Sequence, residues 1–213
     1  MTRLQISLAL NFLLLALLII SFSSDRTKLN QRRMRMSENK TIPDALTVIH
    51  RRKSVRHFTS EPVSHEQLTT LVRAGMAAPT GRNLQPWAFV AVTRRLMLDS
   101  LANYLPYAKM LTQAQAAIIV CGDMNKSGGS ELWIQDCSAA TQNILLAAEA
   151  LGLGAVWTAA FPYENRMSVV RQVLKLPRHL IPLCVIPIGH PTGADQPKDK
   201  WKPENLRWEE WGE

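Results

Sequence analysis

The sequence A-P-T-G-R-N-L-Q-P-W occupies Ala78–Trp87 and leads directly into the apolar run A-F-V-A-V-T at Ala88–Thr93. Turn-forming residues crowd between the two prolines, so we expect an exposed loop held at the edge of a sheet. The amide and hydroxyl side chains of such a loop suit hydrogen bonds to the ring nitrogens and carbonyls of a planar heteroaromatic ligand. This loop and the strand after it are the reference point for the rest of the chain.

The elements on either side of the loop follow from helical spacing of apolar residues and from short continuous apolar runs. Helices are expected at about 41–52, 65–76, 131–151 and 164–174, with further helices broken by a proline within 94–115. Strands are expected at 88–93, 116–121, 155–158 and 180–188. This order predicts an α+β fold in which helices flank one mixed central sheet.

Two details of this prediction concern the ends and positions of elements. Thr41 is expected to cap the first helix, and Ser64 followed by Gln67 has the spacing of a capping box at the second. The last strand contains Pro182 and Pro187, which cannot donate to a neighbouring strand. Proline therefore favours an edge position for that strand or irregularity at its ends.

The net charge of +8 over 213 residues is unevenly distributed. Residues 1–36 carry +5, which leaves +3 for the remaining 177 residues. That remainder has no long run of cations and no interleaving of cations with aromatic residues, so nucleic-acid binding is not expected. Length alone fits a single domain with a tail.

The three cysteines, Cys121, Cys137 and Cys184, each lie in an apolar stretch. Their number is odd, and no pair has the spacing of zinc ligands or of a redox dithiol. Buried free thiols are therefore expected, which favours a reducing compartment. No cluster of histidines and carboxylates indicates a metal site.

The chain begins with a hydrophobic segment over residues 1–24, with its membrane-type run at 4–22, and continues into a basic linker over 25–40. The segment is either a signal peptide, a retained membrane anchor, or a stretch that precedes a true start at Met34 or Met36. More positive residues follow the run than precede it, and positive flanks stay in the cytoplasm. A retained anchor and a late start both predict that the domain at 41–213 lies in the cytoplasm. A cytoplasmic domain is therefore expected in preference to a secreted one.

A basic turn, R-R-K-S-V-R, lies at Arg51–Arg56. Alternate residues of an extended segment point the same way, so Arg52, Ser54 and Arg56 are expected to converge on one anion such as a phosphate. The competing interpretation is a solvated basic turn without a ligand.

In the loop, Asn83 and Gln85 lie two residues apart and would face the same way if the loop is extended. They either meet a ligand or satisfy the backbone of their own loop. The sequence shows no nucleotide-binding glycine motif and no nucleophile motif. This inventory suits an enzyme whose chemistry belongs to a bound cofactor.

Four motifs in order resemble the nitroreductase family: R-R-K-S-V-R-H-F at Arg51–Phe58, A-A-P-T-G-R-N-L-Q-P-W at Ala77–Trp87, A-L-G-L-G-A-V-W at Ala150–Trp157, and I-G-H-P at Ile188–Pro191 followed by K-D-K at Lys198–Lys200. The resemblance runs from about residue 41 to the C-terminus. It implies an α+β, FMN-binding fold that works as an intertwined homodimer with two flavins at the subunit interface.

The resemblance also implies roles for single residues. Arg52, Ser54 and Arg56 match positions that bind the FMN phosphate and ribityl end, and Lys53 contributes its backbone. Lys198 and Lys200 match a basic pair near the phosphate. The second of that pair is often arginine, and a lysine at 200 cannot make the bidentate contact of an arginine.

The flavin ring is implied to meet two further segments. The loop positions that match, partly from the other subunit, are Pro79, Thr80, Asn83 and Gln85. Trp157 and Thr158 match the segment beside the isoalloxazine ring, where a backbone or hydroxyl donor reaches flavin N5. No residue of the chain is expected to be catalytic in its own right, and no metal is expected.

The implied reaction is ping-pong: NADH or NADPH reduces FMN at N5 and leaves, and an electron-poor acceptor such as a nitroaromatic or a quinone follows at the same face. Iodotyrosine deiodinases resemble the chain too, but their substrate lid uses a Glu, a Tyr and a Lys. The corresponding interval here, Arg94–Gln115, holds Tyr104, Tyr107 and Lys109 but no Glu. Besides a nitroreductase and a deiodinase, the remaining alternative is a protein that binds flavin but catalyses no reaction.

Overall fold

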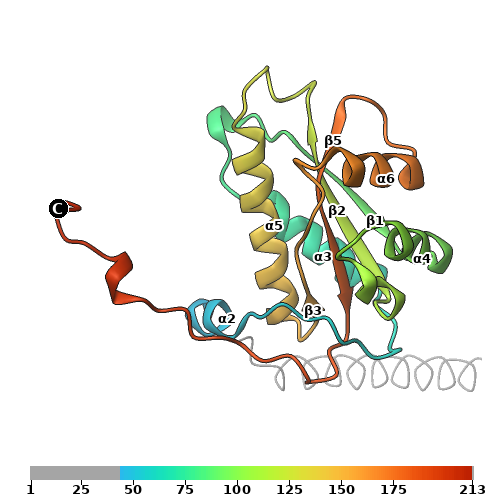
Figure 1. Cartoon of the computed structure of the whole chain (residues 1–213), viewed down its shortest axis with the longest axis horizontal. Coiled ribbons are helices and arrows are strands. Elements are labelled where there is room, and N and C mark those ends of the chain that lie inside the picture. Colours follow the sequence, from blue (N-terminus) through green and yellow to red (C-terminus); the bar gives the residue numbers. More distant parts are fainter. Residues whose placement is uncertain (1–43, 213) are drawn as a thin grey trace, which may run out of the picture. The chain divides into compact units, whose positions relative to one another are not determined.

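The computed structural model describes residues 44–212 (Figure 1). The chain divides into two units, Met1–Ile42 and Pro43–Glu213, and the second unit is the subject here. The hydrophobic segment, the basic linker and Thr41 therefore lie outside the described residues. Within 44–212 no helix combines the length and the apolar character that crossing a membrane requires.

The sheet contains five strands: β1 (Trp87–Val92), β2 (Ala116–Asp123), β3 (Gly154–Ala155), β4 (Thr158–Ala159) and β5 (Leu180–Gly189). Their order is β1-β2-β5-β3, with β4 also pairing with β5. The α+β class is confirmed, but the expected mixed sheet is corrected, because every strand pair within the described chain is antiparallel. The single strand predicted at 155–158 is in fact two short ones.

Of the two alternatives predicted for the last strand, the edge position is wrong, whereas irregularity near its ends agrees with the strand pairing. β5 pairs with β2 along one side and with β3 and β4 along the other. Pro182 and Pro187 both lie outside the short stretches that β3 and β4 pair with. On the other side, the register shifts between Val120 and Cys121, next to the position opposite Pro182. Irregular pairing of this kind lets a central strand tolerate proline.

Helices cover both faces of the sheet (Figure 1). One face carries α3 (His65–Met76) and α5 (Trp133–Ala150), and the other carries α4 (Arg95–Tyr104) and α6 (Glu164–Leu174). β2 separates the two layers: Ile118 and Val120 join the core under α3 and α5, whereas Ile119 and Cys121 join the core under α4 and α6. A strand that is apolar on both sides is what such a three-layer arrangement needs.

The remaining helical elements are α2 (Ala45–Arg51) and the short 3-10 turns η1 (Gly81–Asn83), η2 (Lys109–Thr112) and η3 (Pro203–Asn205). The capping box of Ser64 and Gln67 at α3 is confirmed in both of its hydrogen bonds. The predicted cap at Thr41 lies outside the described residues. Helix α2 begins at Ala45, later than the predicted helix, and the Asp44 carboxylate caps it by accepting from the backbone N–H of Thr47.

The three cysteines are free and fully buried, as expected. Burial raises the pKa of Cys121, Cys137 and Cys184 to about 12 in each case. A thiol reacts as its thiolate, so these groups are inert at neutral pH.

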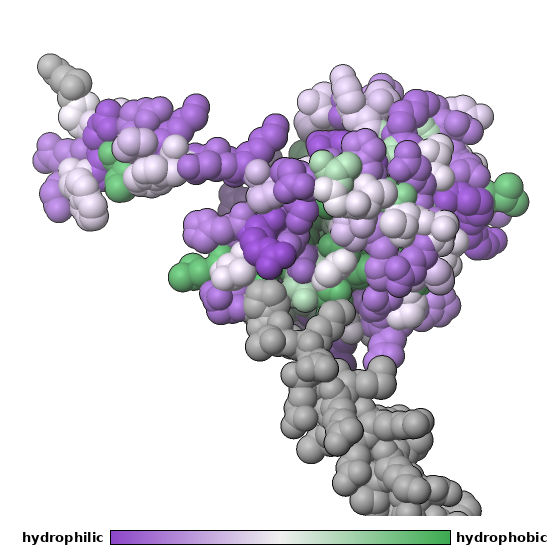
Figure 2. All heavy atoms as spheres, turned by 90° about the horizontal axis from the view of Figure 1, so that it is seen from below, coloured by the Kyte–Doolittle hydropathy of each residue, from purple (hydrophilic) through white to green (hydrophobic). Residues whose placement is uncertain are grey.

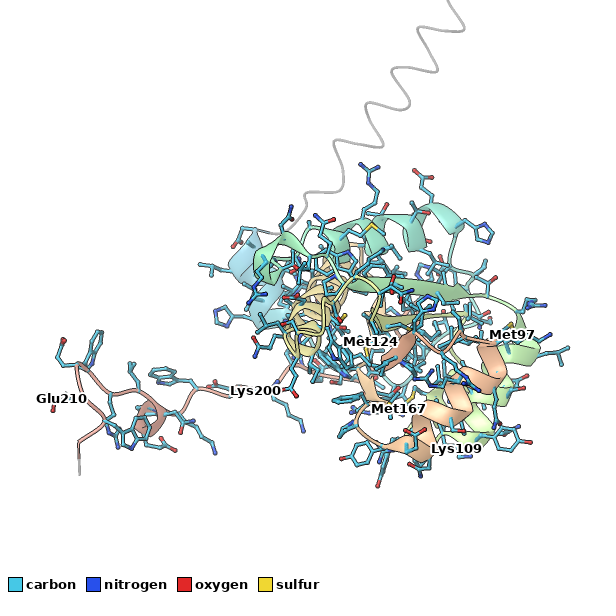
Figure 3. All side chains as sticks on the ribbon, turned by 90° about the horizontal axis from the view of Figure 1, so that it is seen from above. Met97, Lys109, Met124, Met167, Lys200 and Glu210 are labelled. Carbon is cyan, nitrogen blue, oxygen red and sulfur yellow. The ribbon has the colours of Figure 1, made fainter. Side chains whose placement is uncertain are left out.

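After β5 the chain forms a tail that passes α2 and continues away from the sheet (Figures 1 and 3). The tail is a largely hydrophilic lobe in Figure 2, yet it carries three tryptophans with most of their surface exposed. Their exposed fractions are 67% for Trp201, 79% for Trp208 and 68% for Trp211. The Arg207 guanidinium lies over the Trp211 ring, with its carbon 5.2 Å from the ring centroid, and all three rings remain largely exposed.

Candidate functional site

The basic turn begins where α2 ends. Val55 fixes its position, because this side chain is buried and its backbone N–H donates to the Ala155 carbonyl at 3.0 Å. Gly154 permits this close packing, since a Cβ at that position would lie 2.6 Å from Val55 Cγ1. Because the Val55 side chain points into the fold, the side chains of its two neighbours, Ser54 and Arg56, point outward.

Arg52, Ser54 and Arg56 lie together in an open cavity of about 530 Å³, which we call the basic cavity. The opposite wall comes from the start of the tail, and it brings in Lys198 and Lys200. Its lining residues are Arg52, Ser54, Arg56, Ala194, Asp195, Gln196, Pro197, Lys198 and Lys200. Two segments about 140 positions apart in the chain thus place four cations and a hydroxyl around one space.

Asp195, which sequence reasoning missed, joins these two walls. Its carboxylate accepts from the backbone N–H groups of Arg56 at 2.9 Å and His57 at 3.2 Å, and it lies 3.2 Å from His57 Nδ1. Burial raises the pKa of Asp195, but the hydrogen bonds from Arg56 and His57 outweigh burial and lower the pKa below its usual value. The carboxylate is therefore charged at neutral pH and holds the tail against the basic turn.

Lys53 has a different position from its neighbours. Its Nζ lies 3.1 Å from Glu149 Oε2 near the end of α5, and Arg51 Nε approaches the same carboxylate at 3.9 Å. The Lys53 side chain is absent from the lining of the basic cavity. Its contact with Glu149 fixes the turn to α5, which leaves only its backbone for a ligand.

Trp157 and Thr158 lie in a second cavity of about 530 Å³, which adjoins the basic cavity through Arg56. We call it the ring-side cavity, and its lining residues are Arg56, Pro106, Tyr107, Lys109, Met110, Val156, Trp157, Thr158, Ala159 and Arg166. The Thr158 hydroxyl is buried and donates to the Val185 carbonyl at 2.7 Å. Its hydrogen is thus already used by the fold, so the Thr158 hydroxyl has none left to donate to a ligand.

The loop at Ala78–Trp87 is built on Asp136 in the first turn of α5. The buried Asp136 carboxylate accepts from the Gly81 backbone N–H at 2.9 Å and from the Thr80 hydroxyl at 3.1 Å. The Thr80 hydroxyl in turn accepts from the Gln85 backbone N–H at 3.0 Å. Thr80 therefore shapes the loop, and sequence reasoning missed the buried aspartate that holds it.

The loop is a tight turn and not an extended segment. Arg82, Asn83 and Gln85 have positive φ angles of 55°, 55° and 48°. Such angles cost about 1–3 kcal/mol each in non-glycine residues and persist where surrounding contacts impose them. The turn presents Pro79, Asn83 and Gln85 to solvent, and Gln85 Nε2 donates to Asn83 Oδ1 at 2.9 Å.

The loop and the basic turn attach to opposite ends of α5. Asp136 holds the loop and Glu149 holds the turn, and these residues are about 20 Å apart along the helix at 1.5 Å per residue. None of Pro79, Thr80, Asn83 or Gln85 lines either cavity described above. Within one chain, the structure does not bring the loop and the turn to one ligand.

Replacing Asp136 with alanine is expected to lower the free energy of unfolding by about 1–3 kcal/mol, because the Gly81 N–H and the Thr80 O–H lose their buried acceptor. Urea denaturation at fixed protein and flavin concentration measures the change. The matched control is Asp99→Ala, which removes an exposed carboxylate paired only with Arg95 four residues away. A pair of that kind contributes about 0.5 kcal/mol; equal losses in the two variants would contradict the anchoring role of Asp136.

Comparison with known proteins identifies relatives of the same fold. The family model described as "Nitroreductase family" matches residues 49–190 of this chain. A "Putative NADH dehydrogenase/NAD(P)H nitroreductase" of Methanothermobacter thermautotrophicus is 39% identical over 168 residues, which cover 79% of this chain and 88% of that protein. A solved structure of the same description from Bacteroides thetaiotaomicron is 54% identical, with a TM-score of 0.75 and coverage of 79% and 99%.

A third relative was solved with a ligand. The crystal structure of a nitroreductase from Desulfovibrio desulfuricans in complex with FMN is 30% identical and has a TM-score of 0.69. The match covers 81% of this chain and all of that one. Sequence match, identity and fold agree, and the chain belongs to the nitroreductase family.

Proposed function

We propose that this protein is an FMN-dependent oxidoreductase that takes reducing equivalents from NADH or NADPH and passes them to electron-poor acceptors such as nitroaromatics or quinones. The observation that carries the proposal is the pair of adjoining cavities joined at Arg56, one rich in phosphate-binding groups and the other walled by aromatic residues. FMN has the same two parts, a phosphate at one end and a flat ring at the other.

The basic cavity fits the phosphate end by the chemistry of its donors. Arg52 and Arg56 offer planar guanidinium forks, Ser54 offers a short hydroxyl donor, and Lys198 and Lys200 offer ammonium groups. The one carboxylate present, Asp195, already accepts from backbone N–H groups on the basic turn. These N–H groups partly neutralise the negative charge of Asp195. The carboxylate therefore repels an anionic ligand less than a carboxylate without hydrogen bonds would.

The ring-side cavity fits the flat end. Trp157 and Tyr107 give it aromatic walls, and Met110 adds a polarisable side chain that adapts to a ring. When bound, FMN supplies the hydride and electron transfer that no side chain of this site can perform. The chain's own residues then bind the two ends and hold the ring beside the backbone of Trp157 and Thr158.

A homodimer is part of the proposal. The loop with Asn83 and Gln85 presents its amides at the far end of α5 from the basic turn, and three tail tryptophans are largely exposed. A second copy would bring a loop to each pair of cavities and would bury the tryptophan rings, which are otherwise costly to expose. NAD(P)H and the acceptor would use the same exposed face in turn, as in a ping-pong reaction.

Flavin reduction tests the function directly. The purified protein is expected to be yellow, or to become yellow when FMN is added, and to lose its flavin absorbance when NADH or NADPH is added without oxygen. A nitroaromatic or quinone should then restore the absorbance. A yellow protein that neither nucleotide bleaches would point to flavin binding without turnover, and a protein that takes up no FMN would overturn the cofactor assignment.

A further inference from the structure

We propose that the ring-side cavity selects flat electron acceptors that carry an anionic group, such as an aromatic carboxylate. This inference rests on the function proposed above and specifies its substrate class. Three cations from three different segments line the cavity: Arg56 from the basic turn, Lys109 from η2 and Arg166 from α6. No aspartate or glutamate lines it, unlike the basic cavity with Asp195.

Arg166 is held in place without a carboxylate partner. Its guanidinium carbon lies 3.8 Å from the ring centroid of Tyr163 and 5.1 Å from that of Tyr107, and Nη1 donates to the Ala159 carbonyl at 3.3 Å. Among residues 44–212 no acidic side chain forms an ion pair with Arg166, or with Lys109. Stacked rings orient the guanidinium and leave its charge uncompensated.

Uncompensated cations beside a ligand-sized cavity attract an anion more strongly than they do on an open surface, because fewer waters screen them. Lys109 lies beside α6, on the side of the domain away from Lys200 of the basic cavity (Figure 3). The anionic group it would meet is therefore distinct from a phosphate held by Arg52 and Lys198. Tyr107 is 70% exposed, so much of its ring is accessible to the ring of an incoming molecule even with Arg166 beside it.

The selection of an anion leaves the redox chemistry unchanged. The anionic group of the acceptor would pair with Arg166 and Lys109, while its flat ring stacks in the cavity and receives electrons from the cofactor. The pairing would act mainly on capture of the acceptor, so kcat/KM should respond more than kcat. High salt should weaken the capture of an anionic acceptor, because screening shortens the reach of exposed charges.

The test compares two acceptors of nearly the same shape, 4-nitrobenzoate and 4-nitrobenzamide, which differ in charge. The FMN-loaded protein is first reduced with dithionite, so the measurement does not depend on the reaction with NAD(P)H. Reoxidation followed by stopped flow should favour the benzoate about tenfold in second-order rate constant, the worth of one charge-assisted hydrogen bond. Adding salt should reduce this preference and leave the benzamide rate unchanged.

Variants then locate the preference. Lys109→Gln and Arg166→Gln should each lower the benzoate-to-benzamide ratio several-fold, and because the ratio compares two acceptors on the same variant, an effect of the substitution on the flavin cancels. Lys126→Gln is the matched control, since this exposed lysine pairs with Asp123 and lies outside the ring-side cavity. A wild-type ratio near one, or a ratio that Lys126→Gln lowers as much as the cavity variants do, would overturn the inference.

A second arm separates the acceptor from the other available anion, the phosphates of the nicotinamide nucleotide. Reduction of the oxidised protein is measured with NADH and with NADPH in the same variants. Slower reduction by both nucleotides, with an unchanged benzoate preference, would assign the cations to the nucleotide and overturn the inference. Absence of any bleaching by either nucleotide would instead count against the proposed function, and the dithionite arm would still report on the cavity.

Discussion

Replacing Gly122 with alanine is expected to destabilise the fold by about 3 kcal/mol, the upper part of the usual range for overpacking a core. Gly122 lies in β2, directly opposite Trp87 on β1. A Cβ at this position would lie 2.3 Å from Trp133 Cε3 and 2.8 Å from Trp133 Cδ2. The added methyl group must therefore displace a large ring.

Trp133 cannot give way easily. It is buried at the first position of α5, and its ring meets Phe161 edge to face with centroids 5.0 Å apart. Moving the ring would shift the first turn of α5, which also carries Asp136 and therefore the loop. Overpacking at Gly122 is thus expected to weaken flavin binding as well as the core.

Urea denaturation measures the loss of stability, and a double-mutant cycle identifies its cause. If the clash with the indole is responsible, Gly122→Ala should cost much less in a Trp133→Leu background, since neighbouring residues are not additive. Overpacking usually costs at least about 1 kcal/mol, so a Gly122→Ala variant whose free energy of unfolding lies closer than that to the wild type would contradict the prediction. Equal losses of stability in the wild-type and Trp133→Leu backgrounds would contradict it too.

Replacing Arg52 with alanine is expected to weaken FMN binding by about 1–3 kcal/mol, or roughly 5- to 150-fold in Kd, the typical worth of a charge-assisted hydrogen bond. Arg52 follows the last residue of α2 in extended conformation, and its side chain lines the basic cavity. Titration of the flavin-free protein with FMN, followed by flavin fluorescence, gives the change in Kd.

The chain offers a matched control one residue away. Arg51 is also a cation, but it is exposed, lies outside the basic cavity and reaches only Glu149 at 3.9 Å. Arg51→Ala should leave the Kd for FMN nearly unchanged. Riboflavin, which lacks the phosphate, should bind the Arg52 variant and the wild type equally; a loss of riboflavin affinity equal to that of FMN would remove Arg52 from the phosphate site.

Local signals in the sequence determined much of the frame. The capping box at Ser64 and Gln67 set the start of α3, and continuous apolar runs located β1 and β2, because these features depend on neighbouring residues alone. The alternation of Arg52, Ser54 and Arg56 is also local, and these three side chains do line one cavity. The identification of FMN as the cofactor rested on resemblance to a family and not on any local pattern of residues.

Tertiary structure alone decided the features that join distant segments. The central position of β5 depends on which strands pair with it, and proline content could not reveal that. Asp195 joins the tail to a turn 139 positions earlier, and Glu149 of α5 binds the Lys53 side chain, away from its cationic neighbours in the basic cavity. Side chains that look equivalent along a chain acquire different roles once folding surrounds each with different partners.

The loop at Ala78–Trp87 shows the same division. Its composition predicted an exposed loop of hydrogen-bonding residues next to a strand, and the structure contains one, although the loop is a tight turn and not extended. What composition could not predict is the buried carboxylate of Asp136, about 55 positions away, which holds the turn at the opposite end of α5 from the basic cavity. That separation is a property of helix length in three dimensions, and it is the physical reason why one chain alone does not bring both halves of the proposed site together.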